Sequence, residues 1–161
     1  MKMVVAMYPG RFDPVTNGHL DIVDRASKIF DHLIIGIAAG DVKTNLFSAE
    51  ERAELFKKST AQYDNISVEI FDGLTIDTAR NLNVNVLIRG LRAVTDFTTE
   101  FDMALMNRDM EQEIESIFFI TDLGNLFLSA SRVRELASYG VNVDQYVPDI
   151  VSKELTKKFN S

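Results

Sequence analysis

The chain has 161 residues, a net charge of −7 at pH 7, a hydrophobic content of 46% and no cysteine. The length suits one domain with its own core, the lack of cysteine excludes disulfides and thiolate metal sites, and no apolar run approaches membrane-spanning length. Non-specific nucleic-acid binding needs a basic surface, so we expect no nucleic-acid partner for this acidic chain. We also expect a single cytoplasmic domain, residues 1–161, with no membrane partner.

Apolar runs alternate with helical patterns along the chain. The predicted strands cover residues 3–7, 33–38, 66–71, 86–88 and 117–120. The predicted helices lie near residues 19–30, 49–61, 75–83, 96–110, 131–139 and 148–159. This alternation is typical of a parallel sheet with helices on both faces. We therefore expect a Rossmann-like, doubly wound, five-stranded α/β fold with C-terminal helices.

The first predicted strand leads into a turn at residues 8–19 (YPGRFDPVTNGH), which holds two glycines, two prolines and one of the two histidines. Glycine lets a ligand approach the backbone closely, and a helix N-terminus presents free N–H groups to anions. We interpret His19, which ends the turn, as a group that acts on a phosphate held there. The other histidine, His32, opens the second predicted strand, and we interpret it as structural.

Polar residues follow four of the predicted strands, at residues 10–19, 40–43, 89–92 and 128–134. Ligands of parallel sheets bind beyond the carboxyl ends of the strands. Cations, glycines and hydroxyls from these segments should therefore meet at one rim. The sequence predicts a phosphate site there, with its positive charge gathered locally against an acidic background.

Two of these segments carry a family resemblance. Residues 16–19 (TNGH) resemble the T/H-x-G-H signature of the nucleotidyltransferase superfamily, and residues 128–134 (LSASRVR) resemble its second signature. Further matching pieces are residues 8–10 (YPG), 12–14 (FDP), 87–92 (LIRGLR), Glu100 and 106–108 (MNR). Together they make the whole chain similar to the bacterial phosphopantetheine adenylyltransferase family.

The resemblance implies an enzyme that transfers the adenylyl group of ATP to 4′-phosphopantetheine, giving dephospho-coenzyme A and pyrophosphate. The acceptor phosphate attacks the α-phosphorus in line, and catalysis rests on positioning and charge stabilisation. The resemblance also implies Mg²⁺ as cofactor, a homohexamer, and a place in coenzyme A biosynthesis in the cytoplasm. Dephospho-coenzyme A or coenzyme A is then a product or feedback ligand.

The resemblance further implies the site residues, with His19 as the catalytic stabiliser of the transition state. It implies ATP contacts for Arg11, Phe12, His19, Gly90, Leu91, Arg92, Glu100, Asn125, Leu126, Phe127, Leu128, Ser129, Ala130 and Ser131. It implies phosphopantetheine contacts for Arg11, Lys43, Leu74, Thr75 and Arg89.

Structural alternatives stand beside several of these roles. Arg89 and Arg92 suit salt bridges with Asp96 or Glu100, although a planar guanidinium also suits phosphate oxygens. Ser131 suits a plain helix N-cap. A solvated loop position is the alternative for the lysine at 43, and a core position is the alternative for the leucine at 74.

Some positions depart from the family pattern. Arg11 stands where threonine or serine is usual, and its guanidinium either strengthens phosphate binding or turns to a carboxylate such as Asp13. Thr99 replaces a usual tyrosine, Ala130 replaces the middle serine of the second signature, and the loop around Lys43 lacks the usual prolines.

These departures leave two other functions open. The arginine at position 11 keeps open another nucleotidyltransferase of the superfamily, with nicotinamide mononucleotide or glycerol phosphate as acceptor. The changes at positions 99 and 130 and around Lys43 keep open a nucleotide-binding relative with weakened catalysis.

Overall fold

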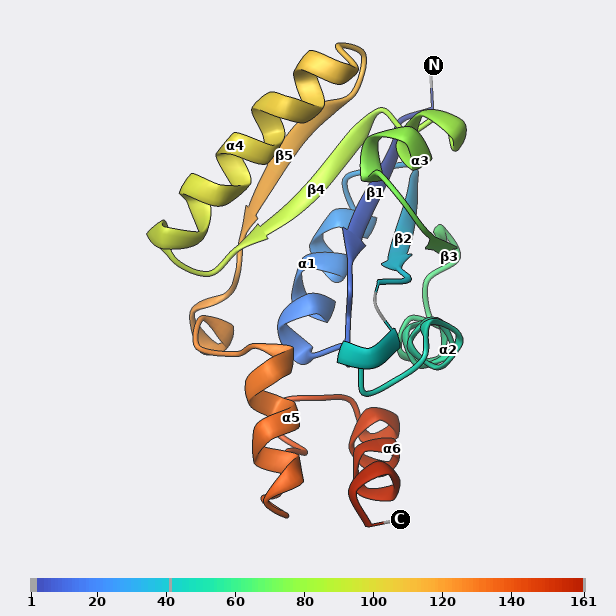
Figure 1. Ribbon diagram of the computed structural model, residues 1–161. Coiled ribbons are helices and arrows are strands. Elements are labelled where there is room, and N and C mark those ends of the chain that lie inside the picture. The colour runs from blue at the N-terminus through green and yellow to red at the C-terminus, as the bar shows by residue number, and fades with distance from the viewer. Residues whose placement is uncertain (1–2, 41, 161) are drawn as a thin grey trace.

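The computed structural model describes residues 3–40 and 42–160 and contains one five-stranded parallel sheet (Figure 1). Its strands are β1 (Val5–Gly10), β2 (His32–Ala38), β3 (Ile66–Phe71), β4 (Val86–Leu91) and β5 (Glu115–Ile120). Its helices are α1 (Asn17–Ser27), α2 (Ala49–Ser59), α3 (Thr75–Asn81), α4 (Val94–Met110), α5 (Ala130–Ser138) and α6 (Asp149–Asn160), with the short 3₁₀ turns η1 (Val42–Thr44) and η2 (Leu123–Asn125).

The strand order is β3-β2-β1-β4-β5, so the chain reverses direction across the sheet between β1 and β4. Such a switch point is where doubly wound sheets bind ligands. β1 pairs with β4 only at Ala6↔Val86 and Met7↔Leu87, whereas it pairs with β2 along its whole length. The carboxyl ends of β1 and β4 therefore separate, and a crevice opens between them.

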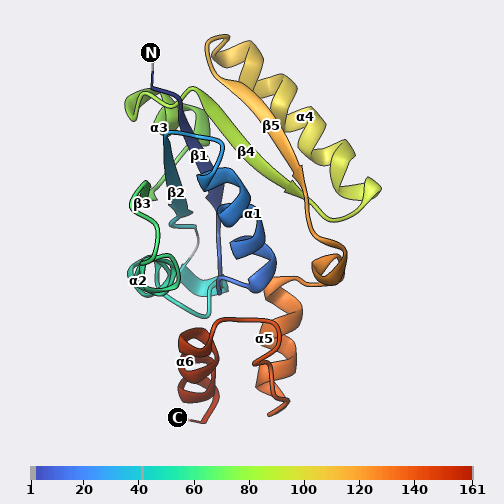
Figure 2. The same cartoon turned by 180° about the vertical axis from the view of Figure 1, so that it is seen from behind.

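Alternate side chains of the strands enter two separate cores, one on each face of the sheet. Ala6 and Leu33 belong to the larger core, together with side chains of α1 and α2. Met7 and Ile34 belong to the smaller core, together with side chains of α3. Figures 1 and 2 show α4 on the face opposite α1. The expected doubly wound α/β fold is confirmed.

The helices α5 and α6 lie beyond the carboxyl ends of the strands (Figure 1). Val133, Val151 and Leu155 anchor them in the larger core, each at most 1% exposed. Burying an aliphatic side chain of this size stabilises the fold by about 1.5–3 kcal/mol. Core packing therefore holds these two helices in place at the end of the sheet where the crevice opens.

Helix α4 is packed differently, because none of its residues is buried. It lies along β4 and β5 at one side of the molecule (Figure 1). Its exposed apolar side chains are Val94, Phe97, Phe101, Met103, Leu105, Met106 and Met110. No helix in the described part of the chain is long and apolar enough to cross a membrane.

The strand ends differ from the prediction. β1 continues through Pro9 to Gly10 and β4 continues through Gly90 to Leu91, three residues beyond each apolar run. The backbone pairing with the neighbouring strand carries on through Pro9 and Gly10, as in Gly10↔Ile37. The strands themselves therefore deliver Gly10 and Gly90 to the rim.

Candidate active site

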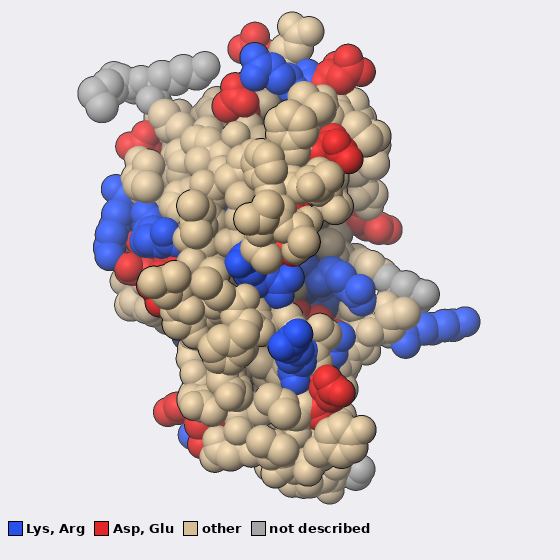
Figure 3. Space-filling view, turned by 90° about the vertical axis from the view of Figure 1, so that its left-hand side faces the viewer, with Lys and Arg blue, Asp and Glu red and all other residues tan. Residues whose placement is uncertain are grey.

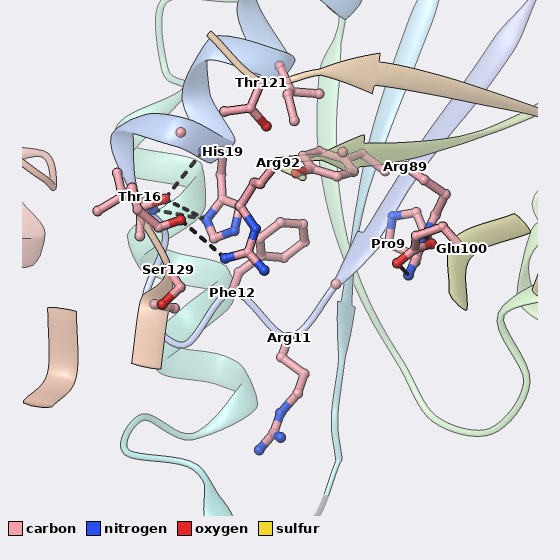
Figure 4. A pocket seen from close by; sticks show the side chains of 17 residues that line it. Pro9, Arg11, Phe12, Thr16, His19, Arg89, Arg92, Glu100, Thr121 and Ser129 are labelled. Atoms are coloured by element: carbon pink, nitrogen blue, oxygen red, sulfur yellow. Dashed lines mark hydrogen bonds and ion pairs between the residues drawn. The ribbon is translucent and has the colours of Figure 1, made fainter. Parts of the chain in front are cut away.

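A cavity of about 210 Å³ opens where β1 and β4 separate (Figure 4). Its walls come from the first turn, the end of β4, α4, the segment after β5 and the start of α5. Its lining residues are Tyr8, Pro9, Gly10, Arg11, Phe12, Thr16, Gly18, His19, Ile22, Arg89, Gly90, Arg92, Glu100, Thr121, Leu128, Ser129 and Ala130. Figure 3 shows basic side chains gathered across the middle of one face, although the net charge of the chain is −7.

The first turn fixes the histidine ring through a capping box. Thr16 is the N-cap of α1, and its side chain accepts a hydrogen bond from the His19 backbone N–H. The Thr16 backbone N–H donates in return to Nδ1 of His19 at 3.0 Å. Because Nδ1 accepts this bond, a neutral imidazole carries its proton on Nε2.

The surroundings of His19 keep the imidazole neutral. Its ring meets the Phe12 ring edge to face, with 4.9 Å between centroids. Burial, together with the positive charge of Arg92, lowers the pKa of His19 to about 4. Burial also raises the pKa of the Tyr8 hydroxyl above its usual range. At pH 7 both groups are therefore uncharged hydrogen-bond donors at the cavity wall.

The packing of α1 against β4 bears on the glycine at position 90. A Cβ there would lie 2.5 Å from Cδ1 of Ile22 and 3.4 Å from the hydroxyl of Tyr8. A larger residue at position 90 would therefore require the Ile22 side chain to move.

Arg89 in β4 and Arg92 directly after it form the salt bridges that were the structural alternative. Arg89 meets Glu100 through two hydrogen bonds, Nε to Oε2 at 2.5 Å and Nη2 to Oε1 at 2.8 Å. Nε of Arg92 lies 3.5 Å from Oδ2 of Asp96, and its Nη1 donates to the Leu128 carbonyl at 3.2 Å. Both arginines nevertheless line the cavity, so salt bridging and exposure to a ligand coexist.

The start of α5 differs from the expectation that Ser131 caps the helix. Ser129 is the N-cap, and its hydroxyl accepts a hydrogen bond from the Arg132 backbone N–H. Ser131 lies inside the first turn of the helix, so its expected capping role is wrong. The two serine hydroxyls are 3.2 Å apart. This places hydroxyls and free backbone N–H groups of one helix N-terminus beside the cavity.

Arg11 lies at the rim with its side chain directed away from the His19 ring (Figure 4). Its Nη2 donates to Oγ1 of Thr44 at 2.9 Å and to Oδ1 of Asn45. The alternative in which Arg11 turns to Asp13 is wrong. The arginine instead ties the first turn to the loop after β2.

The carboxylate of Asp13 is buried, and both of its oxygens accept hydrogen bonds. It accepts hydrogen bonds from the backbone N–H groups of Leu46 and Phe47 at 2.8 and 3.0 Å. Nη1 of Arg134 lies 3.4 Å from Oδ2 of Asp13 and also donates to its backbone carbonyl. These contacts join the first turn, the loop before α2 and the helix α5.

Comparisons with known proteins agree with this geometry. The cytidylyltransferase-like family matches residues 7–136. A phosphopantetheine adenylyltransferase of Dictyoglomus turgidum is 45% identical over 157 residues, 98% of each chain. The Leptospira biflexa protein of the same name is 46% identical over 156 residues, 97% of this chain and 98% of its own. The chain belongs to the phosphopantetheine adenylyltransferase family.

A solved structure gives the same fold at much lower identity. The bifunctional NMN adenylyltransferase/ADP ribose pyrophosphatase of Francisella tularensis, complexed with AMP and a manganese ion, superimposes with a TM-score of 0.73 at 18% identity. The match covers 99% of this chain and 50% of that protein. At this identity the likeness concerns the fold alone.

Many residues implied by the family resemblance meet in the cavity. They are Arg11, Phe12, His19, Arg89, Gly90, Arg92, Glu100, Leu128, Ser129 and Ala130. The neighbouring segments hold Leu91, Asn125, Leu126, Phe127 and Ser131, which do not line it.

The implied acceptor residues on the other side lie outside the cavity lining. Lys43 is exposed in η1, and Thr75 begins α3. Leu74 is 57% exposed, so its core alternative is wrong. Asp41, which belongs to the rim segment at residues 40–43, lies outside the described residues.

His32 lies away from the cavity, as its structural interpretation predicts, and several further residues line the cavity. Nε2 of His32 lies 2.9 Å from Oγ of Ser67, away from the cavity. The lining residues to which the sequence assigned no individual role are Tyr8, Pro9, Gly10, Thr16, Gly18, Ile22 and Thr121. Most belong to the turn at residues 8–19, whose composition already pointed to a ligand. Thr121 directly follows β5, where the rule on strand ends would have found it.

Proposed function

We propose that this protein transfers the adenylyl group of ATP to 4′-phosphopantetheine, with dephospho-coenzyme A and pyrophosphate as products, in coenzyme A biosynthesis. A phosphate oxygen of the acceptor forms a bond to the α-phosphorus, and the bond from that phosphorus to the bridging oxygen of pyrophosphate breaks. The observation that carries the proposal is full-length identity of 45% and 46% to proteins that bear this activity in their names. The cavity at the switch point supplies the donors such a transfer needs.

His19 is the catalytic residue of this proposal. Its Nε2–H donates to a non-bridging oxygen of the α-phosphate, where negative charge builds in the transition state. The Thr16 backbone N–H fixes the tautomer and the direction of the ring. The lowered pKa supports a neutral donor, so the imidazole gives a hydrogen bond without giving up a proton.

The remaining residues divide between the two substrates. Residues 90–92, Glu100 and residues 125–131 bind ATP, and the N-terminus of α5 receives its β- and γ-phosphates. Lys43, Leu74, Thr75 and Arg89 bind phosphopantetheine. Phe12 lies on the ATP side, and Arg11 lies between the two substrates, with contacts to both.

Mg²⁺ enters this proposal as an ion bound to the phosphates of ATP, where it reduces their charge. The described residues contain no group of three or more His, Cys, Asp or Glu side chains that could hold a metal ion. Among the described residues that line the cavity, Glu100 is the carboxylate, and Arg89 engages both its oxygens. The residues present therefore do not fit a resident metal site.

A homohexamer is the proposed assembly, and the six-fold count comes from the family resemblance. The helix α4 supports self-association, because it has no buried residue and exposes a row of apolar side chains. Contiguous exposed apolar surface marks an interaction site. The proposal treats residues 1–161 as one catalytic domain in the cytoplasm, with dephospho-coenzyme A or coenzyme A as product or feedback ligand.

The test is the release of pyrophosphate with purified protein, ATP and Mg²⁺, with and without 4′-phosphopantetheine. We expect release only when both substrates are present. Nicotinamide mononucleotide and glycerol phosphate in parallel reactions test the other acceptors of the superfamily. Absence of release above background, with an active control enzyme in the same assay, would overturn the proposal. Faster release with either alternative acceptor would reassign the substrate.

A further inference from the structure

Arg52 on α2 is a buried cation that the proposed chemistry does not use. The residue is 1% exposed and is among the largest fully buried side chains. Within residues 3–40 and 42–160, no carboxylate forms an ion pair with its guanidinium. Burial lowers the pKa of Arg52, and the nearby charge of Asp13 opposes this effect. A buried charge is costly unless it is fully hydrogen-bonded, so its partners should indicate its role.

Backbone carbonyls satisfy this guanidinium. It donates to five of them: Nε to Phe47 and Ser48 at 3.1 and 3.2 Å, Nη1 to Arg11 and Ala38 at 2.7 Å each, and Nη2 to Ala39 at 2.8 Å. Hydrogen bonds from a charged donor are roughly twice as strong as neutral ones. One side chain therefore binds three separate segments of the chain.

Those three segments surround the acceptor side of the cavity. They are the first turn at Arg11, the end of β2 at residues 38–39, and the start of α2 at residues 47–48. The last two are the ends of the loop that carries Lys43. Arg52 thus holds both ends of this loop from inside, while the Arg11 side chain holds Thr44 and Asn45 within the loop.

In the described residues, the ATP-binding segments at the end of β4 and the start of α5 accept no hydrogen bond from this guanidinium. The N-terminus of α5 is tied instead to the end of β4 by Arg92 and to the first turn by Arg134. Losing the Arg52 bonds should therefore displace one half of the site and leave the other in place.

We infer that Arg52 is a positioning residue that sets the geometry of the acceptor site by fixing the first turn and both ends of the Lys43 loop. This inference rests on the proposed function for the identity of the acceptor. It predicts that Arg52 acts on the binding of phosphopantetheine and has little effect on the binding of ATP.

The test compares Arg52→Lys and Arg52→Met with a matched control, Leu55→Ala. Lysine keeps the charge, but its compact ammonium cannot span three segments. Leu55 lies on the same helix and is 5% exposed, and its truncation weakens the core without removing a bond to the loop. Steady-state KM and kcat are measured for each substrate, and the melting temperature is measured for each variant.

We expect Arg52→Lys to raise KM for 4′-phosphopantetheine about tenfold and to change KM for ATP by less than about twofold. Arg52→Met should show the same split more strongly, and Leu55→Ala should show no split at a comparable loss of stability. Equal changes in both KM values, or the same split in Leu55→Ala, would overturn the inference. If the methionine variant does not fold, the lysine variant still decides.

Hydrogen exchange provides a readout that does not depend on turnover. In Arg52→Lys, we expect the amides of Leu46 and Phe47 to exchange faster than in wild type, with no change at the N-terminus of α5. Unchanged exchange at these amides would contradict the inference even if activity fell. A wild-type protein that releases no pyrophosphate would overturn the proposed function, and the exchange data would still show whether Arg52 fixes the loop.

Discussion

The two walls of the cavity are held in place in different ways. The inner wall, formed by Thr16, His19 and Ser129, belongs to helix starts that are packed onto the larger core. The outer wall, formed by Arg89, Arg92 and Glu100, depends on α4, which has no buried residue. Capping bonds fix the inner wall, and salt bridges between half-buried or exposed side chains fix the outer wall.

The difference shows which parts of the site one chain can complete alone. The inner wall carries the proposed catalytic donor, and its geometry comes from bonds within a few residues of sequence. The outer wall carries the arginines and rests on α4, whose apolar face is exposed in a single chain. The following predictions change one wall at a time.

The largest effect is expected at the inner wall. His19→Ala should lower kcat about 10²- to 10³-fold, because it removes a donor aimed at developing charge. The circular dichroism spectrum should stay that of wild type. His32→Ala is the matched control, and its kcat should stay within about twofold of wild type, because His32 contacts Ser67 away from the cavity. Equal losses in both variants would remove His19 from the mechanism.

The same histidine should make stability depend on pH. Its folded pKa of about 4 lies below the ordinary value of 6.5, so the unfolded state binds the extra proton between these values. The stability contribution is present above pH 6.5 and is lost as pH falls toward 4, by at most about 3 kcal/mol. Urea unfolding of wild type and His19→Asn at pH 7 and pH 4.5 measures it. A wild-type loss no larger than that of the variant would contradict this origin.

At the outer wall, charges on α4 should separate the subunits. Phe101→Asp combined with Met106→Asp should dissociate the assembly in sedimentation velocity experiments and lower kcat/KM about tenfold, because Glu100 and its helix lose their support. Lys57→Asp, at an exposed position on α2, changes the net charge by the same amount and should leave the assembly intact. An unchanged sedimentation coefficient in the double variant would show that this face is not the interface.

The smallest effect is expected at the rim between the walls. Arg11→Ala should raise KM for the acceptor about threefold, because Arg11 is exposed and holds neutral partners. The free energy of unfolding should stay within about 0.5 kcal/mol of wild type. An increase in KM of a hundredfold or more would instead make Arg11 a principal phosphate ligand.

Periodicity predicted the number and order of the strands and helices, because buried parallel strands leave continuous apolar runs. It could not predict that β1 continues through Pro9 and Gly10, since backbone pairing alone extends the strand there. The rule on strand ends likewise predicted that the segments at residues 10–19, 89–92 and 128–134 meet at the cavity, whereas Lys43, from the fourth predicted segment, lies outside its lining. It could not predict that Arg89 pairs with Glu100, because that choice depends on where α4 lies.

The burial of Arg52 is the clearest feature that the sequence could not predict. Within the predicted helix at residues 49–61, an arginine beside glutamates is typical of a solvated face. Its burial follows from the convergence of five carbonyls from three segments, which no local pattern contains. The exposure of the apolar row on α4 could not be predicted from the sequence either, because periodicity does not distinguish a core from an interface.

The proposed reaction is adenylyl transfer to phosphopantetheine with His19 at the α-phosphate. Phosphorus NMR tests it most directly, by following ATP and 4′-phosphopantetheine with wild type and with His19→Ala under identical conditions. We expect pyrophosphate and the diphosphate of dephospho-coenzyme A to appear together in equal amounts with wild type, and neither to accumulate over the same period with the variant. Pyrophosphate without dephospho-coenzyme A, or a variant as fast as wild type, would contradict the account.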